Sequence, residues 1–256
     1  MNLIQLLNRI TVAPELDFGN IFGESIDLFK KTWGQGVVFI LVNMALAVPA
    51  IIILYMPMIV AATSGVSQAD IEAGNLSIWY QVVFGLLFLP IIAVIQTITL
   101  GLTAGFYRIV KDLDHNQNSQ GTSLFMFFKK GHLGKLFLIA IISLGITILA
   151  TLLCFFPVIY VAIPVGLFPV IFAFNPELTS SEIVKAAFKL GNKKWLLLFG
   201  LTIVAYFLSQ IVGLLLCGIG LFVTASFVYL PIYLVYKQSV GFEQTKEISQ
   251  IETSEI

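Results

Sequence analysis

Residues 136–174 read LFLIAIISLGITILATLLCFFPVIYVAIPVGLFPVIFAF and contain no charged side chain. As one helix, this segment would run on the order of 60 Å, about twice the hydrocarbon thickness of a bilayer. It must therefore fold back on itself. We place the turn near Phe156 and Pro157, because proline cannot continue a hydrogen-bonded helix and restricts the residue before it. Pro164 and Pro169 predict that the second limb is short and kinked or broken.

The whole chain shares this apolar character. Of its 256 residues, 58% are hydrophobic and 11% are charged, and the mean hydropathy is +0.97. A soluble domain carries about a quarter charged residues, so this chain has too few charges to cover a water-facing surface. We predict an all-α, polytopic membrane protein.

Three further charge-free segments complete the set of predicted spans. Val37–Ala62 and Trp79–Tyr107 each suit one crossing, which needs about 20 residues. Trp195–Tyr236 is again too long for one helix, and Gly218 and Gly220 predict its turn, because glycine commonly ends helices. The six predicted spans lie near 37–60, 80–107, 136–156, 158–174, 195–216 and 220–236.

A Phe-Lys pair stands eight residues before an apolar run at three places in the chain. We call residues 29–36, 128–135 and 188–195 the elbows; they read FKKTWGQG, FKKGHLGK and FKLGNKKW. Their recurrence predicts three parallel repeats, each an interfacial amphipathic helix followed by a membrane helical hairpin. The predicted repeats lie at about 18–110, 120–174 and 177–236.

The clearest interfacial helix is TSSEIVKAAFKLG, residues 179–191. Thr179 and Glu182 match the capping box that begins a helix, and Gly191 is expected to end it. Its apolar face is expected to rest on the inner headgroup layer. That face comprises Ile183, Ala186, Ala187 and Leu190.

All fourteen lysine and arginine residues fall on one side of the predicted spans. The positive-inside rule makes that side cytoplasmic, and both termini lie on it. The predicted division is an N-terminal cytoplasmic segment at 1–17, a six-span domain at 18–236 and a flexible cytoplasmic tail at 237–256. A short surface helix is predicted in the N-terminal segment. Its apolar face comprises Leu3, Ile4, Leu7 and Ile10.

Lysine and tryptophan side chains of the elbows are predicted to anchor the chain at the membrane interface, because ammonium groups there reach anionic headgroups. The predicted anchors are Lys30, Lys31, Trp33, Lys129, Lys130, Lys189, Lys193, Lys194 and Trp195. The expected partner is therefore the lipid bilayer. A membrane-protein partner or a second copy of the chain stays open, and nothing indicates nucleic acid.

The sequence contains no P-loop, dinucleotide fingerprint, zinc-protease motif or Ser-His-Asp arrangement. No ionisable Asp, Glu, Lys, Arg or His falls inside a predicted span, although such residues commonly mark ion-coupled transport. His115 and His132 lie outside the spans, and neither belongs to a cluster with metal-ligand spacing. We therefore expect no cofactor, no metal and no catalysis.

Uncharged polar residues within the spans have two interpretations. Such residues ordinarily hold membrane helices together. If a substrate path exists instead, Asn43, Gln96 and Gln210 are the candidates for lining its cavity. Cys154 and Cys217 occupy matching places at predicted outer ends of spans. They could form a disulfide in an oxidising periplasm or pack as small apolar residues.

Two stretches carry a resemblance to known proteins: EIVKAAFKLGNKKWLLLF from Glu182, and LLLCGIGLFVTASFVYLPIYLVYK from Leu214. Together they resemble uncharacterised bacterial membrane proteins that are similar to the membrane domain fused to some glycerophosphoryl diester phosphodiesterases. The resemblance covers roughly residues 120–240. It implies a bacterial cytoplasmic (inner) membrane protein, and it transfers no catalytic residue to this chain.

Two functional hypotheses follow from these observations. The first is a non-enzymatic scaffold, assembly or envelope-homeostasis component that contacts lipid or partners through its lysine-rich elbows. The second is a permease-like carrier for a small or lipid-like solute, favoured by the proline-broken spans and the uncharged polar residues. A membrane enzyme is a third possibility.

Overall fold

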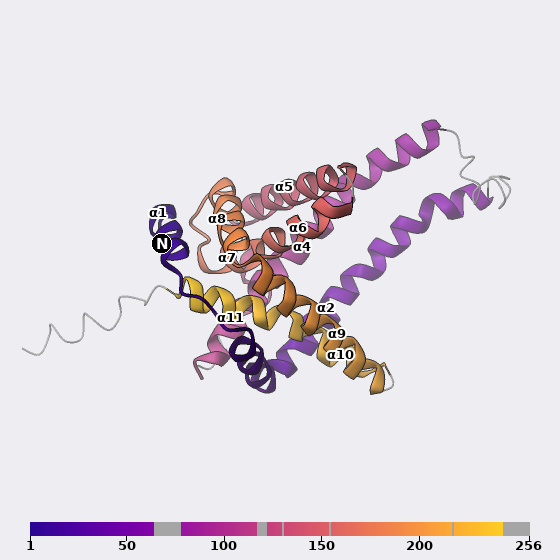
Figure 1. The fold of residues 1–256 in the computed structure, drawn as a ribbon. Helices are drawn as coiled ribbons and strands as arrows, with labels where there is room; N and C mark the ends of the chain where they lie inside the picture. Colours follow the sequence, from indigo (N-terminus) through magenta and orange to yellow (C-terminus); the bar gives the residue numbers. More distant parts are fainter. Residues whose placement is uncertain (64–77, 117–121, 130, 154, 217, 243–256) are drawn as a thin grey trace, which may run out of the picture.

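The computed structural model describes residues 1–63, 78–116, 122–129, 131–153, 155–216 and 218–242 (Figure 1). Every regular element in these ranges is a helix, which confirms the all-α prediction. Six helical segments are long and apolar enough to cross a bilayer. The chain therefore has the architecture of a multi-pass membrane protein, with the number of spans that the sequence predicts.

In chain order, the described helices are α1 (Leu3–Val12), α2 (Phe18–Thr63), α4 (Ile78–Asp114), η2 (Met126–Phe128), α5 (Leu133–Leu152), α6 (Phe155–Gly166), α7 (Phe168–Phe174), α8 (Ser180–Lys193), α9 (Trp195–Leu215), α10 (Gly220–Thr224), η3 (Ala225–Val228) and α11 (Tyr229–Ser239).

Helices adjacent in sequence pack side by side in three pairs: α2 with α4, α5 with α6, and α9 with α10. The turn between α5 and α6 comes earlier than the predicted Phe156-Pro157 position, because α5 ends at Leu152 and α6 already begins at Phe155. Pro157 is accommodated in the first turn of α6, where its missing N–H has no intrahelical partner to lose. The turn before α10 contains Gly218 at φ +80°, as predicted for a helix-ending glycine.

The fourth span is broken, as its prolines predict. Helix α6 ends at Gly166, two residues after Pro164, and α7 begins at Phe168 with Pro169 in its first turn. That position tolerates proline because the first N–H groups of a helix have no intrahelical acceptor.

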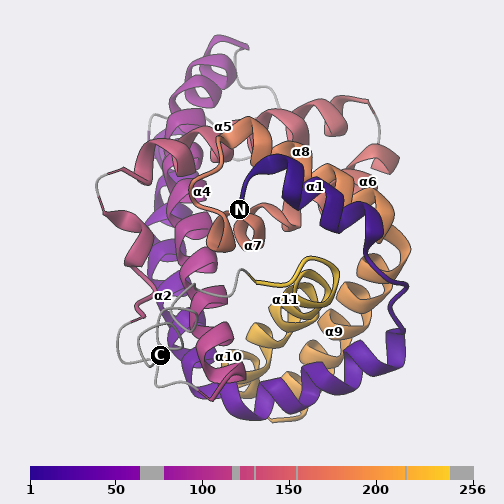
Figure 2. The ribbon, with the colours of Figure 1, turned by 90° about the vertical axis from the view of Figure 1, so that its left-hand side faces the viewer.

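The three elbows differ from one another in structure. In the first, α2 stays helical through Gly34 and Gly36, although Figures 1 and 2 together show that α2 changes direction along its length. Gly36 lies against η3, and a β-carbon there would come within 2.7 Å of the Ser226 β-carbon. The predicted repetition of a separate interfacial helix is therefore absent from the first elbow, and internal repetition stays a prediction.

In the described residues just before the second elbow, a single 3₁₀ turn, η2, stands in place of the expected amphipathic helix. The Ser123 hydroxyl accepts a hydrogen bond from the Phe125 N–H, and the Ser123 carbonyl accepts one from Met126. Serine side chains that bond their own backbone in this way compete with helix formation. Gly131, at φ +113°, then turns the chain toward α5.

The third elbow begins within α8 and ends at the first residue of α9, and the predicted capping box of α8 is present. The Thr179 hydroxyl accepts from the Glu182 N–H, and the Glu182 carboxylate accepts from the Thr179 N–H at 2.8 Å, which lowers the pKa of Glu182. Gly191 does not end the helix, which continues to Lys193. A β-carbon at Gly191 would lie 3.0 Å from Pro164, so this glycine permits close packing of α8 on α6.

The buried core lies at the end of the bundle where α1, α7, α8 and α11 gather (Figure 2). The apolar face of α8 is fully buried there against other helices, so the prediction that it rests on the headgroup layer is wrong. Leu6 and Ile10 attach α1 to this core, whereas Ile4, predicted on the same face, is 70% exposed.

The far ends of the helix pairs expose large apolar side chains. Phe156 is 83% exposed, and Leu152 and Leu215 are 77% and 78% exposed. Side chains of this kind and number on a water-facing surface would associate. On a membrane protein they are the lipid-facing surface.

Candidate functional site

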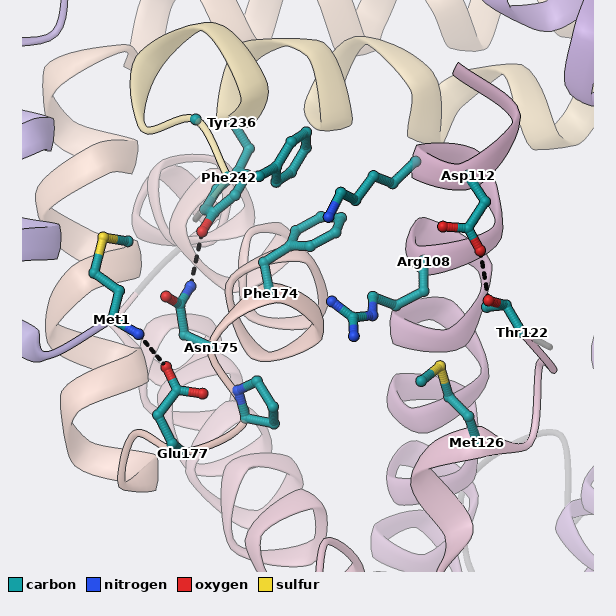
Figure 3. Close-up of a pocket in the computed structure, with 13 residues that line it drawn as sticks. Met1, Arg108, Asp112, Thr122, Met126, Phe174, Asn175, Glu177, Tyr236 and Phe242 are labelled. Atoms are coloured by element: carbon teal, nitrogen blue, oxygen red, sulfur yellow. Dashed lines mark hydrogen bonds and ion pairs between the residues drawn. The ribbon is translucent and has the colours of Figure 1, made fainter. Parts of the chain in front are cut away.

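A cavity of about 330 Å³ opens at the end of the bundle that holds the core (Figure 3). Its walls come from segments far apart in the chain: the C-terminal part of α4, the segment that links α7 to α8, and the residues around Gly241 after α11. Polar and charged side chains from these elements face one another across it. It is the most polar of the described cavities, and we treat it as the candidate site.

Two cations of α4 line this cavity. Arg108 and Lys111 are three residues apart and so lie on one face of the helix. The Arg108 guanidinium lies 5.9 Å from the centre of the Phe174 ring, and the Lys111 ammonium lies 4.9 Å from the centre of the Phe242 ring. Figure 3 shows the Arg108 side chain extending from α4 toward Phe174.

The other charged groups of the cavity already have partners. The Asp112 carboxylate accepts a hydrogen bond from the Thr122 hydroxyl at 2.5 Å. The Glu177 carboxylate lies 2.8 Å from the Met1 ammonium. Asn175, which is buried, donates through its amide to the Tyr236 hydroxyl at 2.7 Å.

An ion pair beside the cavity joins the end of α4 to α11. The Lys237 ammonium lies 2.6 Å from the Asp114 carboxylate, and the Tyr233 hydroxyl donates to the same oxygen at 2.9 Å. These contacts hold the two helices that carry opposite walls of the cavity. The cavity therefore belongs to the packed end of the fold.

Most predicted interface anchors are exposed. Lys30 pairs with Asp27 at 2.7 Å, and Trp33 is 53% exposed. Lys31 lies 3.5 Å from the Asn116 side chain. Two further anchors, Lys129 and Lys189, are exposed, and Lys130 lies outside the described residues.

Lys193 and Lys194 have a different place from the other anchors. The Lys193 ammonium donates to the backbone carbonyls at the end of α1, those of Ile10, Thr11 and Ala13, at 2.9, 2.6 and 2.9 Å. The Lys194 ammonium donates to the Pro14 carbonyl, and its burial, followed by the charge of Lys193, lowers the pKa of Lys194.

Trp195 lies at the start of α9, on the first turn of the fifth span. Its indole N–H donates to the Tyr160 carbonyl at 3.1 Å, and its ring stacks on the Tyr160 and Phe199 rings. A tryptophan with one apolar side and one polar bond suits the boundary between lipid and water.

The three candidate cavity-lining residues do not share a described cavity. Gln96 lines an apolar cavity of about 300 Å³ between α2 and α4, whose described lining includes Ala47 and Phe88 but neither Asn43 nor Gln210. The Asn43 amide donates to the Phe39 carbonyl of its own helix at 2.9 Å. Cys154 and Cys217, proposed as a disulfide or as packing residues, lie outside the described residues.

Several threonine and serine hydroxyl groups inside the spans donate to nearby carbonyls, whereas the buried Tyr107 hydroxyl has no hydrogen-bond partner among the described residues. Thr97 and Thr147 donate to carbonyls four residues earlier, at 2.6 and 2.9 Å. Ser209 of α9 and Thr224 of α10 each donate to the other's carbonyl, at 2.9 and 2.8 Å. In lipid, such bonds remove the cost of an unpaired polar group.

Within the described ranges, no group of three or more His, Cys, Asp or Glu side chains could hold a metal ion. No protein-family model, curated protein or solved structure matches the chain. The geometry is therefore the basis for assigning a function.

Sequence reasoning placed Arg108 and Lys111 on the cytoplasmic side but did not select them as site residues. Their three-residue spacing directly after a predicted span was the available signal. The aromatic walls could not be found this way, because Phe174 and Phe242 come from other parts of the chain.

Proposed function

We propose that this chain is a non-enzymatic multi-pass protein of a bacterial cytoplasmic membrane, acting as a scaffold, assembly or envelope-homeostasis component. It would act through its lysine-bearing end, where anionic headgroups or a membrane-protein partner, including a second copy, would bind. The resemblance to the membrane domain of glycerophosphoryl diester phosphodiesterases is kept as part of this proposal.

One observation supports the proposal: lysines of the elbows, which lie outside the predicted spans, are exposed. Lys30, Lys129 and Lys189 are exposed, whereas the serine and threonine hydroxyls of the spans described above are bonded to neighbouring carbonyls. A carrier needs polar groups that can be released to a solute along a path. A scaffold needs an accessible surface, which these lysines supply.

The second candidate is a carrier of a lipid-like solute. It is favoured by the cavity of about 300 Å³ between α2 and α4, which Gln96 lines among isoleucine and phenylalanine side chains. An apolar pocket with one polar group is typical of sites for largely apolar ligands. The two candidates therefore use different residues at different depths.

Two variants separate these candidates. In proteoliposomes, replacing Asn43, Gln96 and Gln210 by Leu abolishes transbilayer movement of a dye-labelled phospholipid if the chain is a carrier. Replacing Lys30, Lys129 and Lys189 by Gln lowers energy transfer from protein tryptophans to labelled phosphatidylglycerol if the scaffold proposal holds, because exposed lysines attract anionic lipid.

Each variant is the control for the other. The scaffold proposal requires that the leucine variant keep the lipid movement of the wild type and that the glutamine variant lose its lipid enrichment. A loss of lipid movement in the leucine variant, at unchanged protein content, would replace the scaffold by the carrier.

Sidedness has its own test. In a chain with Cys154 and Cys217 replaced by Ala, Ser181→Cys on α8 should resist a membrane-impermeant maleimide added outside intact cells. Ser67→Cys, which the sequence places in the loop on the other side, should react. Labelling of Ser181→Cys from outside would reverse the orientation and the proposed cytoplasmic surface with it.

A further inference from the structure

Arg108 and Lys111 have no hydrogen-bond acceptor or ion-pair partner among the residues that the structure describes. An arginine carries five N–H donors and a lysine three. Two like charges one helical turn apart repel each other. Asp112, beside Lys111 in the chain, offsets part of this repulsion, but its carboxylate is bonded to Thr122. An anion in the cavity would satisfy both cations.

The dimensions of the cavity set the size of that anion. A volume of about 330 Å³ is at the lower end of the roughly 300–1,000 Å³ typical of small-molecule sites. The cavity is larger than a single small ion needs, and part of its wall is apolar, formed by Phe174, Phe242 and Met126. The fitting ligand therefore has an anionic group joined to an organic part.

The position of the two cations in the sequence favours phosphate as the anionic group. Arg108 is the first residue after the charge-free segment that ends at Tyr107, and basic residues at the end of a span are expected to reach phospholipid headgroups. The guanidinium fork matches two oxygens of a phosphate, and an ammonium can bind a third as a point charge.

We propose that this cavity binds the phosphate group of a phosphorylated organic compound through Arg108 and Lys111. The compound is either an anionic phospholipid headgroup that enters from the leaflet or a soluble phosphate ester that enters from the aqueous side. The proposal goes beyond surface contact with lipid, because it assigns one discrete site with defined residues.

Thermal unfolding of the full chain in a neutral detergent tests this site. One arm titrates glycerol 3-phosphate, and the other titrates short-chain phosphatidylglycerol against short-chain phosphatidylcholine. Wild type should unfold at a higher temperature as the ligand is added, because a ligand that binds only the folded state stabilises it. The apparent affinity should fall at least about tenfold in R108Q and in K111Q, since each loses charge-assisted hydrogen bonds.

K185Q is the matched control, because Lys185 is exposed on α8 and does not line the cavity. It loses the same charge and should keep the wild-type affinity. If R108Q does not fold, R108K is the substitute variant. It keeps the positive charge but loses the bidentate N–H geometry of the guanidinium group, so its affinity should be lower than that of wild type but higher than that of K111Q.

The outcomes are distinct. A response to the soluble ester alone, or to the anionic lipid alone, supports the site and identifies the source of the phosphate. A response to both probes indicates that the site recognises the phosphate group that they share. The proposal is overturned if wild type responds to neither probe, or if R108Q and K111Q bind as tightly as K185Q. It is also overturned if R108Q only lowers the unfolding temperature without ligand and keeps its affinity.

Discussion

Gly105→Ala should lower the free energy of unfolding by about 2 kcal/mol. Gly105 lies inside α4 where the segment before η2 crosses it, and an added β-carbon would come within 2.8 Å of the Leu124 carbonyl carbon and 2.9 Å of its Cα. These are backbone atoms, so no side-chain rotation relieves the clash. Overpacking typically costs about 1–3 kcal/mol, from which the better helix propensity of alanine removes up to about 1 kcal/mol.

Gly145→Ala on α5 is the control for this change. An added β-carbon at Gly145 meets no atom within 4 Å, so only the helix propensity changes, and stability should rise by roughly 0.5–1 kcal/mol. Thermal unfolding in detergent, followed by far-ultraviolet circular dichroism, measures both. If the two variants shift the unfolding temperature in the same direction, the close approach of Leu124 to α4 is wrong.

Lys193→Gln should release α1 from the core. The Lys193 ammonium donates to three carbonyls at the end of α1, and hydrogen bonds to a charged group each contribute about 1.5–3 kcal/mol. Because the side chain is partly open to solvent, we expect a net loss of about 2 kcal/mol from the attachment of α1. A glutamine amide can replace at most some of these three hydrogen bonds.

Amide hydrogen exchange across residues 3–12 measures the release, together with the rate of tryptic cleavage after Arg9. Exchange through local opening should accelerate at least about tenfold. Lys189→Gln, one turn earlier on α8 and exposed, removes the same charge and should leave both rates unchanged. Equal acceleration in the two variants would mean that surface charge, and not the three bonds, holds α1.

The number of spans could be predicted because it depends on local quantities. Segments such as 136–174 are too long and too apolar to cross a bilayer once, and Pro169 and Gly218 mark where helices begin or end whatever surrounds them. The capping box of Thr179 and Glu182 is likewise complete within four residues. Predictions of this kind need no knowledge of distant parts of the chain.

The predictions that differed from the structure depended on tertiary contacts. The apolar face of α8 matches an interfacial helix in sequence, but Ala186 and Ala187 lie against neighbouring helices. Gly191 reads as a helix end, yet it provides space for Pro164. Lys193 is predicted as a lipid anchor, and its sequence context does not indicate that its ammonium also binds the end of α1, some 180 residues away in the chain. Periodicity alone cannot distinguish lipid from protein as the apolar neighbour.

The paired hydrogen bonds between Ser209 and Thr224 bear on how this protein is made. Each hydroxyl reaches a carbonyl on the opposite segment, and α10 passes directly into the 3₁₀ turn η3, where the α-helical bonding pattern changes. A nascent segment placed alone among acyl chains would lack these bonds, and hydrocarbon offers no water to replace them. The Thr224 hydroxyl also reaches the Gly220 carbonyl of its own helix at 3.0 Å, so we expect pairing of the fifth and sixth segments during insertion to matter most for the Ser209 hydroxyl.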